Sequence, residues 1–272
     1  MRRAAKDLLA PLFILMALTI LFRLTDLDLR IESLFYSAQD GWIYRNDNPW
    51  MLLYEYGAIP AIALAAGAFI ALLVSYRRQV LMSFRKQLFF ILLVLLIGPG
   101  LIVNLGLKEN WGRPRPREVI YFGGQKEFQK VWEKGPTNSY SFPSGHAAIG
   151  FFMICPYFIF RNRRRRLANA FLIGGLLYGS SMGLARMIQG QHFPSDVIWS
   201  GGLIYLSAVG CYYLLGLHRE CGREGDQIAN SLVVSDPQKA CNAGKCCIDS
   251  PHTDDCGQQS GSRQRTTDLR QG

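Results

Sequence analysis

The chain has 272 residues, of which 49% are hydrophobic and only 18% are charged, and its mean hydropathy is +0.09. This composition argues against a soluble enzyme, and the apolar residues gather into long runs, as they do in an integral membrane protein. The net charge of +10 does not indicate binding to nucleic acid, because the basic residues lie between apolar runs rather than along one stripe.

The apolar runs predict an all-α, polytopic membrane protein with six transmembrane helices. A helix needs about 20 mostly apolar residues to cross the hydrocarbon core of a bilayer. The fourth run is short and contains Pro156, which a membrane helix tolerates where neighbouring groups satisfy the freed carbonyl. In chain order the predicted spans are Leu8–Phe22, Tyr56–Tyr76, Gln87–Leu107, Gly145–Phe160, Leu167–Ala185 and Val197–Leu217.

Lys and Arg residues in short loops predict the orientation of these spans. They cluster at the N-terminus, after the second span at Arg77 and Arg78, and between the fourth and fifth spans at residues 161–166. Short cytoplasmic loops carry an excess of basic residues, so these three segments are expected to face the cytoplasm, together with both termini. The membrane domain is predicted to comprise residues 1–217, and the polar remainder, 218–272, to be a cytoplasmic tail without fixed structure.

One segment that is predicted to lie outside breaks this charge rule. Residues 108–142 hold seven Lys or Arg against four Glu. A basic cluster at an outer membrane surface attracts phosphate groups, whether on lipid head groups or on a bound substrate. Taken alone, the segment is better explained as a solvated charged loop. Its basic residues are Lys108, Arg113, Arg115, Arg117, Lys126, Lys130 and Lys134.

Three polar segments flank the outer ends of the predicted spans. Residues 108–116 follow the third span, residues 142–146 enter the outer end of the fourth, and residues 186–196 join the fifth to the sixth. The predicted topology uses only charge and hydropathy, yet it puts all three segments on one side of the membrane. They are therefore expected to converge into a single site at the outer face.

The side chains of these segments predict a phosphate-binding site. Lys108 supplies a point charge, and Arg115 and Arg186 supply planar forks that suit the oxygens of a phosphate. Ser144 adds a hydroxyl donor, and Gly145 lets the backbone approach an anion closely at the start of a helix.

Two of the four histidines accompany this site. Asp196 follows His192 by four residues, close enough at a helix start for its carboxylate to accept from one imidazole nitrogen and leave the other free. A histidine so oriented is a nucleophile or a general base. Displacement at phosphorus also needs a protonated group near the leaving oxygen, a role that fits His146. Each residue alone has an ordinary structural explanation. Such explanations do not account for the position of all these residues on one side of the membrane, or for a mixture of hydrogen-bond donors that suits a phosphate.

No metal or other cofactor is predicted. Two histidines and one aspartate are enough for a facial triad, but several strong cations in the same site oppose a divalent ion and supply its positive charge instead. Arg113 is a further cation, predicted as an auxiliary phosphate contact. The tail cysteines lack the paired spacing of a zinc site; they include Cys241, Cys246, Cys247 and Cys256.

At these residues the chain resembles the type 2 phosphatidic acid phosphatase (PAP2) superfamily of membrane lipid phosphatases. The family pattern of Lys, six residues and Arg-Pro is met from Lys108 to Pro116, and its Pro-Ser-Gly-His is met by residues 143–146. Its pattern of Ser-Arg, five residues, His, three residues and Asp is met from Arg186 to Asp196, except that Ala185 replaces the usual Ser. With the six-helix topology, the resemblance extends to about residue 217.

The resemblance implies a metal-independent phosphatase of a bacterial inner membrane, with its active site on the periplasmic side. His192 would attack phosphorus to form a phosphohistidine, Asp196 would orient it, and His146 would protonate the leaving oxygen. The residues that would hold the phosphoryl oxygens are Lys108, Arg115, Ser144, Gly145 and Arg186.

The substrate that the resemblance implies is a membrane lipid with a phosphate on its head group. Family members act on phosphatidate, phosphatidylglycerophosphate, undecaprenyl pyrophosphate, or the 1- and 4′-phosphates of lipid A. The stretch from Trp111 through Phe122 to Trp132 is most similar to the bacterial lipid A phosphatase branch, and the additional basic residues suit a polyanionic glycolipid. A lipid phosphotransferase and a non-catalytic lipid-binding protein stay open as alternatives, and no oligomeric state is predicted.

Overall fold

A computed structural model describes residues 2–135 and 139–219, and nearly all of its regular structure is helical. Five of its helical segments are long and apolar enough to cross a membrane, and a further apolar helix, Gly145–Phe160, is shorter. They correspond to the six predicted spans and confirm the all-α membrane fold. The predicted tail lies outside the described residues from residue 220 onward.

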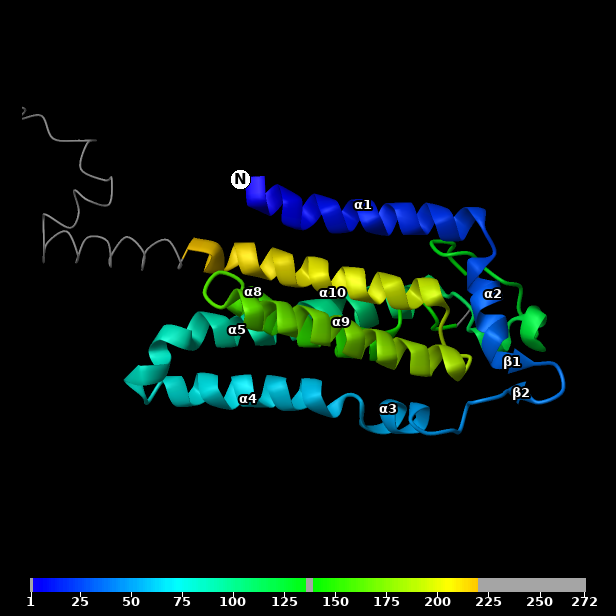
Figure 1. Ribbon diagram of the computed structural model, residues 1–272, viewed down its shortest axis with the longest axis horizontal. Helices are drawn as coiled ribbons and strands as arrows, with labels where there is room; N and C mark the ends of the chain where they lie inside the picture. Colours follow the sequence, from blue (N-terminus) through cyan, green and yellow to red (C-terminus); the bar gives the residue numbers. More distant parts are fainter. Residues whose placement is uncertain (1, 136–138, 220–272) are drawn as a thin grey trace, which may run out of the picture. The chain divides into compact units, whose positions relative to one another are not determined.

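The spans are built from ten helical elements. They are α1 (Arg2–Leu24), α3 (Trp50–Tyr56) with α4 (Ile59–Ser75), α5 (Arg85–Leu95) with η3 (Leu96–Lys108), α7 (Gly145–Phe151) with η6 (Phe152–Ile154) and α8 (Cys155–Phe160), α9 (Arg165–Ile188) and α10 (Pro194–Leu214). The long helices α1, α4, α9 and α10 lie roughly parallel in Figure 1. Short elements connect them: α2 (Leu27–Glu32), η1 (Ser33–Phe35), the antiparallel strands β1 (Tyr36–Ser37) and β2 (Gly41–Trp42), η2 (Gln79–Phe84), α6 (Glu109–Trp111), η4 (Pro116–Glu118) and η5 (Ile120–Phe122).

The third span is not a continuous α-helix. After α5 the chain continues as η3, a π-helix of 13 residues that contains Pro99. Proline has no amide hydrogen and its ring displaces a preceding carbonyl, so it favours a widened helical turn. Asn104 donates its side-chain amide to the carbonyl oxygen of Pro99 at 2.7 Å. The π-helix ends at Lys108, and it therefore sets the position of the first predicted phosphate contact.

Glycines of α9 let neighbouring helices approach its backbone. A Cβ on Gly175 would lie 2.7 Å from the backbone nitrogen of Ile154, and one on Gly179 would lie 2.3 Å from the ring of Phe151. Gly183 is similarly close to a side chain of α10. Small residues at such positions are what permits tight helix packing within a membrane. The fourth span and α10 therefore pack directly on α9, whose end carries Arg186.

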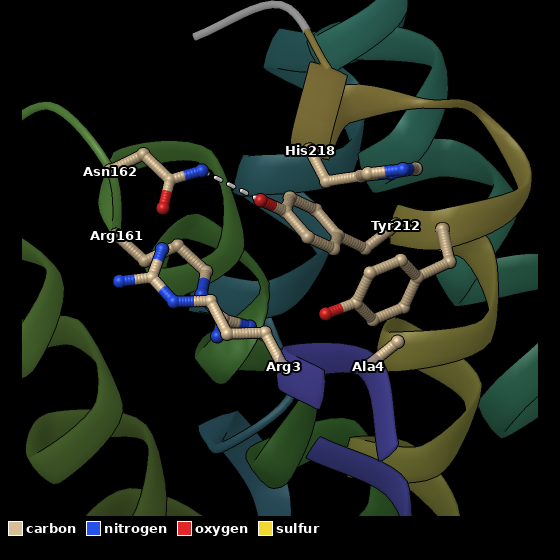
Figure 2. Close-up of a pocket in the computed structure, with 7 residues that line it drawn as sticks. Arg3, Ala4, Arg161, Asn162, Tyr212 and His218 are labelled. Carbon is tan, nitrogen blue, oxygen red and sulfur yellow. Dashed lines mark hydrogen bonds between the residues drawn. The ribbon is translucent and has the colours of Figure 1, made fainter. Parts of the chain in front are cut away.

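The two ends of the bundle differ in their chemistry. Helix α1 begins, α10 ends and the α4–α5 and α8–α9 connections lie at one end (Figure 1). There, Asp7 accepts from Tyr213 at 2.7 Å and pairs with Arg161 at 2.8 Å, beside a cavity of about 300 Å³. Figure 2 shows this cavity, where Asn162 donates to Tyr212. Elements α2, β1, β2 and α3 lie at the opposite end, with the connection from α9 to α10.

Candidate active site

The three motifs come together where α9 meets α10. Lys108 ends η3, Ser144 immediately precedes α7, and His192 lies in the turn between α9 and α10. A Cβ on Gly145 would lie 2.9 Å from Oδ1 of Asn104 and 3.4 Å from Nζ of Lys108, so glycine lets the end of η3 pack closely against the start of α7. The charges of Lys108 and Arg186 both act on the imidazole of His192. The predicted convergence of these residues is thus present in the fold.

A backbone carbonyl holds the His192 ring. His192 is 2% exposed, and its Nδ1 lies 2.6 Å from the carbonyl oxygen of Ser141. Because a carbonyl can only accept a hydrogen bond, Nδ1 is the donor and Nε2 keeps its lone pair. Any nucleophilic or basic chemistry of this residue therefore belongs to Nε2.

Asp196 does not contact this imidazole in the direct way that the sequence predicts. Its Oδ2 lies 3.9 Å from Nδ1 of His192, which is beyond hydrogen-bond distance. Oδ2 accepts instead from the Ser141 hydroxyl at 2.6 Å and from the Phe193 N–H at 2.8 Å. The carboxylate thus fixes the residue whose carbonyl orients the histidine. Motif spacing could not reveal Ser141, because the group that acts is its backbone.

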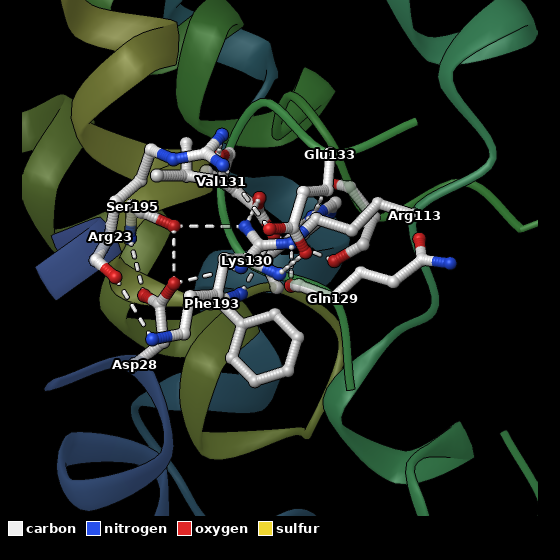
Figure 3. A network of polar contacts seen from close by, with 12 residues as sticks. Arg23, Asp28, Arg113, Gln129, Lys130, Val131, Glu133, Phe193 and Ser195 are labelled. Atoms are coloured by element: carbon white, nitrogen blue, oxygen red, sulfur yellow. Dashed lines mark hydrogen bonds and ion pairs between the residues drawn. The ribbon is translucent and has the colours of Figure 1, made fainter. Parts of the chain in front are cut away.

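Arg113 lies in a buried network and not among the phosphate contacts, which corrects the auxiliary role predicted for it. Its guanidinium donates to Asp28 at 2.8 Å, to the Ser195 hydroxyl at 2.9 Å and to Asp196 at 2.5 Å (Figure 3). Its Nε donates to the carbonyl of Gln129 at 3.0 Å. The physical reason is that two buried carboxylates occupy the guanidinium, since buried charges must be paired. Arg113 therefore holds Asp196 in place and connects α2 to α10.

The surroundings of His192 keep its ring neutral. Burial has the largest effect and lowers the pKa of His192 well below its usual value of 6.5, and the charges of Arg186 and Lys108 lower it further. The hydrogen bond to Ser141 acts in the opposite direction with a smaller effect. At neutral pH the imidazole is therefore uncharged, which is the form that a nucleophile requires.

Tyr54 joins the second histidine to the arginines. Its ring centre lies 5.4 Å from that of His146 and 4.4 Å from Cζ of Arg186, whose Nη1 donates to Gln189 at 2.5 Å. Tyr54, Arg115 and Arg186 line a cavity of about 360 Å³. Within the described part of the chain, Nε of Arg115 and Nε of Arg186 are buried without a hydrogen-bond partner, so they are available to an anion. Tyr54 precedes the second predicted span and belongs to no motif, so sequence reasoning missed it.

The described residues contain no cluster suited to a metal ion. Across residues 2–135 and 139–219, no three His, Cys, Asp or Glu side chains are arranged to bind one. The two cysteines described there, Cys155 and Cys211, are buried within spans. The tail cysteines considered in the sequence lie outside the described residues.

Comparison with known proteins identifies relatives of this site. The chain is 40% identical over 140 residues to a lipid A 4′-phosphatase of Francisella tularensis subsp. novicida, covering 51% of this chain and 62% of the relative. It is 34% identical over 119 residues to a lipid A 4′-phosphatase of Rhizobium leguminosarum, covering 42% and 50%. The chain thus matches about half of the length of these curated relatives, and no solved structure matches it.

The family comparison covers the part of the chain that holds all three motifs. The model of the PAP2 superfamily matches residues 87–220, from the third span to the end of the described helices. This range includes every predicted phosphate contact and both candidate catalytic histidines. Over residues 87–220, the chain is thus similar to the PAP2 superfamily.

Proposed function

We propose that this protein is a membrane lipid phosphatase that removes a phosphate from lipid A at the periplasmic face of a bacterial inner membrane. The observation that carries the proposal is His192, a buried and neutral imidazole with Nδ1 fixed by Ser141. Lys108, Arg115 and Arg186 are close enough for their charges to act on it. The relatives named lipid A 4′-phosphatase support this choice of lipid.

The proposed periplasmic location follows from the charge of the opposite end. The N-terminus and the basic segments that follow the second and fourth spans lie at the end where α1 begins (Figure 1). Basic loops of this length stay in the cytoplasm. The site is at the other end, so it opens to the periplasmic surface, where lipid phosphates are within reach.

In the first proposed step, Nε2 of His192 attacks phosphorus, and the bond between phosphorus and the leaving oxygen breaks. The phosphoryl oxygens gain interactions with Lys108, Arg115 and Arg186, which offset the charge of the transition state. The proton on Nδ1 stays in place, donated to the Ser141 carbonyl. His146 gives its proton to the leaving oxygen, and the negative charge of the bound phosphate favours the protonated form of His146 beforehand.

In the second proposed step, water attacks the phosphohistidine. His146 is neutral after the first step and takes a proton from this water. The bond between phosphorus and Nε2 breaks, inorganic phosphate leaves, and His192 returns to its neutral form. The two histidines thus exchange no proton directly, and each needs only its own fixed position.

The proposal is tested by phosphate release from the purified protein in detergent with a chelator present. Lipid A, undecaprenyl pyrophosphate, phosphatidate and phosphatidylglycerophosphate are compared. We expect the fastest release from lipid A, loss of release in His192→Ala, and wild-type release in the matched control His218→Ala at the other end of the bundle. Activity in chelator would also support metal-independent hydrolysis.

Each alternative has a distinct result in this assay. Faster turnover of a glycerolipid or of the polyprenyl pyrophosphate would replace the substrate and keep the histidine chemistry. Transfer of the phosphoryl group to a lipid acceptor without free phosphate would indicate a phosphotransferase. Binding of lipid A without release or transfer would contradict the proposal and identify a lipid-binding protein.

A further inference from the structure

The cavity beside the candidate active site contains more positive charge than one phosphoryl group requires. Four arginines line it: Arg45, Arg115, Arg117 and Arg186. Arg115 and Arg186 belong to the motifs and hold the reacting phosphoryl group in the proposed mechanism. Arg45, from the turn after β2, and Arg117, from η4, belong to no motif and have no role in that mechanism.

Arg45 and Arg117 carry positive charge that the described part of the chain leaves without a carboxylate partner. Other basic residues of the outer loop differ in this respect. Lys126, Lys130 and Arg113 each form an ion pair with a carboxylate, at 3.0, 3.7 and 2.8 Å respectively. Of the described basic residues in the loop that form no ion pair, Arg115 and Arg117 line the cavity, whereas Lys108 and Lys134 do not.

The charges of Arg45 and Arg117 act on each other. Arg117 is repelled by Arg115 and Arg45 and attracted by Glu118. That carboxylate already accepts from Lys126 at 3.0 Å and from Ser139 at 2.7 Å. Gathering arginines without a dedicated carboxylate is unfavourable unless an anion is bound among them.

Backbone hydrogen bonds position the segments that carry the two arginines. The N–H of Arg45 donates to the carbonyl of Trp42 at 3.3 Å, and the N–H of Arg117 donates to the carbonyl of Gly190 at 3.1 Å. A Cβ on Gly190 would lie 2.3 Å from the Trp42 ring, so the indole packs directly on this turn. Gly190 also has φ of +64°, which glycine adopts without strain. The contact between Trp42 and Gly190 thus joins the segments that carry both arginines.

The cavity is also larger than a single phosphoryl group. Its volume of about 360 Å³ lies in the range of small-molecule sites. The amides of Gln189 and Gln191 line it together with the arginines. Amides are suited to the hydroxyl and acyl-amide groups of an amino sugar, and guanidinium groups to a phosphate.

We propose that Arg45 and Arg117 form a second anion subsite, which binds a second phosphate group of the same lipid while Arg115 and Arg186 hold the reacting one. The inference rests on the proposed function and makes it more specific, because it requires a substrate with two phosphates. A lipid with only one phosphate would leave the second subsite without its anion.

The test compares a glycolipid that carries two phosphates with its two mono-phosphorylated forms of the same acyl composition. The full-length protein is assayed in neutral detergent, so that no other anionic lipid is present, and kcat/KM for phosphate release is measured. The variants are Arg45→Ala, Arg117→Ala, the double variant and the conservative Arg45→Lys. The matched control is Arg30→Ala, which removes an exposed cation from α2, outside the cavity.

The wild type should prefer the bis-phosphorylated lipid. Each Ala variant should lower this preference about ten-fold through KM, as expected for the loss of one charge-assisted hydrogen bond. Arg45→Lys should keep part of the preference, and Arg30→Ala should keep all of it. Binding of the same lipids to the His192→Ala protein should show the same order.

Two results would overturn the inference. One is phosphate release with no preference for two phosphates, or with a preference that the variants leave unchanged. The other is an effect of the variants only when vesicles of an anionic phospholipid are added, which would assign the arginines to bulk lipid head groups. If no substrate releases phosphate, the proposed function fails and the subsite fails with it. If phosphate is released without the expected preference, only the subsite fails. Phosphate release therefore distinguishes the two failures.

Discussion

Arg113→Ala should lower stability and Arg115→Ala should lower activity, although only Pro114 separates the two arginines. Removing Arg113 leaves Asp28 and Asp196, which are 2% and 0% exposed, without their counter-charge. Breaking a buried ion pair by removing one partner costs about 3–5 kcal/mol. For a protein of this size, each kcal/mol lowers Tm by about 2–4 °C, so Tm should fall by about 10 °C.

Arg115 lines the cavity, and its guanidinium has no carboxylate partner among the described residues, so its removal should spare the fold. Arg115→Ala should keep the wild-type Tm and lower phosphate release by about a hundredfold, as expected for one lost donor to a charged transition state. Tm would be followed by tryptophan fluorescence in detergent, and release by inorganic phosphate. Wild-type Tm together with a raised KM in Arg113→Ala would show that Arg113 binds phosphate and does not stabilise the buried carboxylates.

Three further predictions concern pH dependence and packing. Since the pKa of His192 lies well below 6.5, its neutral form persists as pH falls, and kcat/KM should decline only below pH 6.5; a decline that begins higher would contradict this. Gly179→Ala should lower the free energy of unfolding by about 1–3 kcal/mol, because the new Cβ would meet the ring of Phe151. A Cβ on Gly174 would meet no atom, so calorimetry should find Gly174→Ala more stable than Gly179→Ala. Burial raises the pKa of Glu32, so unfolding releases its proton and the free energy of unfolding falls as pH rises above 4.5. Glu32→Gln should therefore raise Tm more at pH 8 than at pH 5. Equal gains in Tm at the two pH values would contradict this role of Glu32.

The spans and the chemistry of the motifs could be predicted because both are properties of local sequence. A run of about 20 apolar residues is visible without tertiary structure, and so is the excess of basic residues in short loops. Together they place Lys108, His146 and His192 on one side of the membrane before any contact is known. The π-helix before Lys108 was not predictable, since an apolar run with Pro99 inside it specifies a span but not its helical pitch.

The interactions around the histidine could not be predicted, because they depend on tertiary contacts. Arg113 and Arg115 have the same side chain in the same short segment, and distant buried carboxylates distinguish them: Asp28, 85 residues away along the chain, and Asp196 both pair with Arg113. Ser141 acts through its carbonyl, a group that every residue has. Tyr54 reaches the site because α3 covers it, which hydropathy alone does not show.

The most direct test of the proposed mechanism is to identify the residue that carries the phosphoryl group during turnover. The protein would be mixed with lipid A labelled in its phosphates, quenched within the first turnovers and kept alkaline, and the label located by mass spectrometry of its peptides. The proposed mechanism predicts a phosphohistidine at His192, absent from His192→Ala and present in His218→Ala. Label on another residue, or release of phosphate by His192→Ala at the wild-type rate, would contradict it.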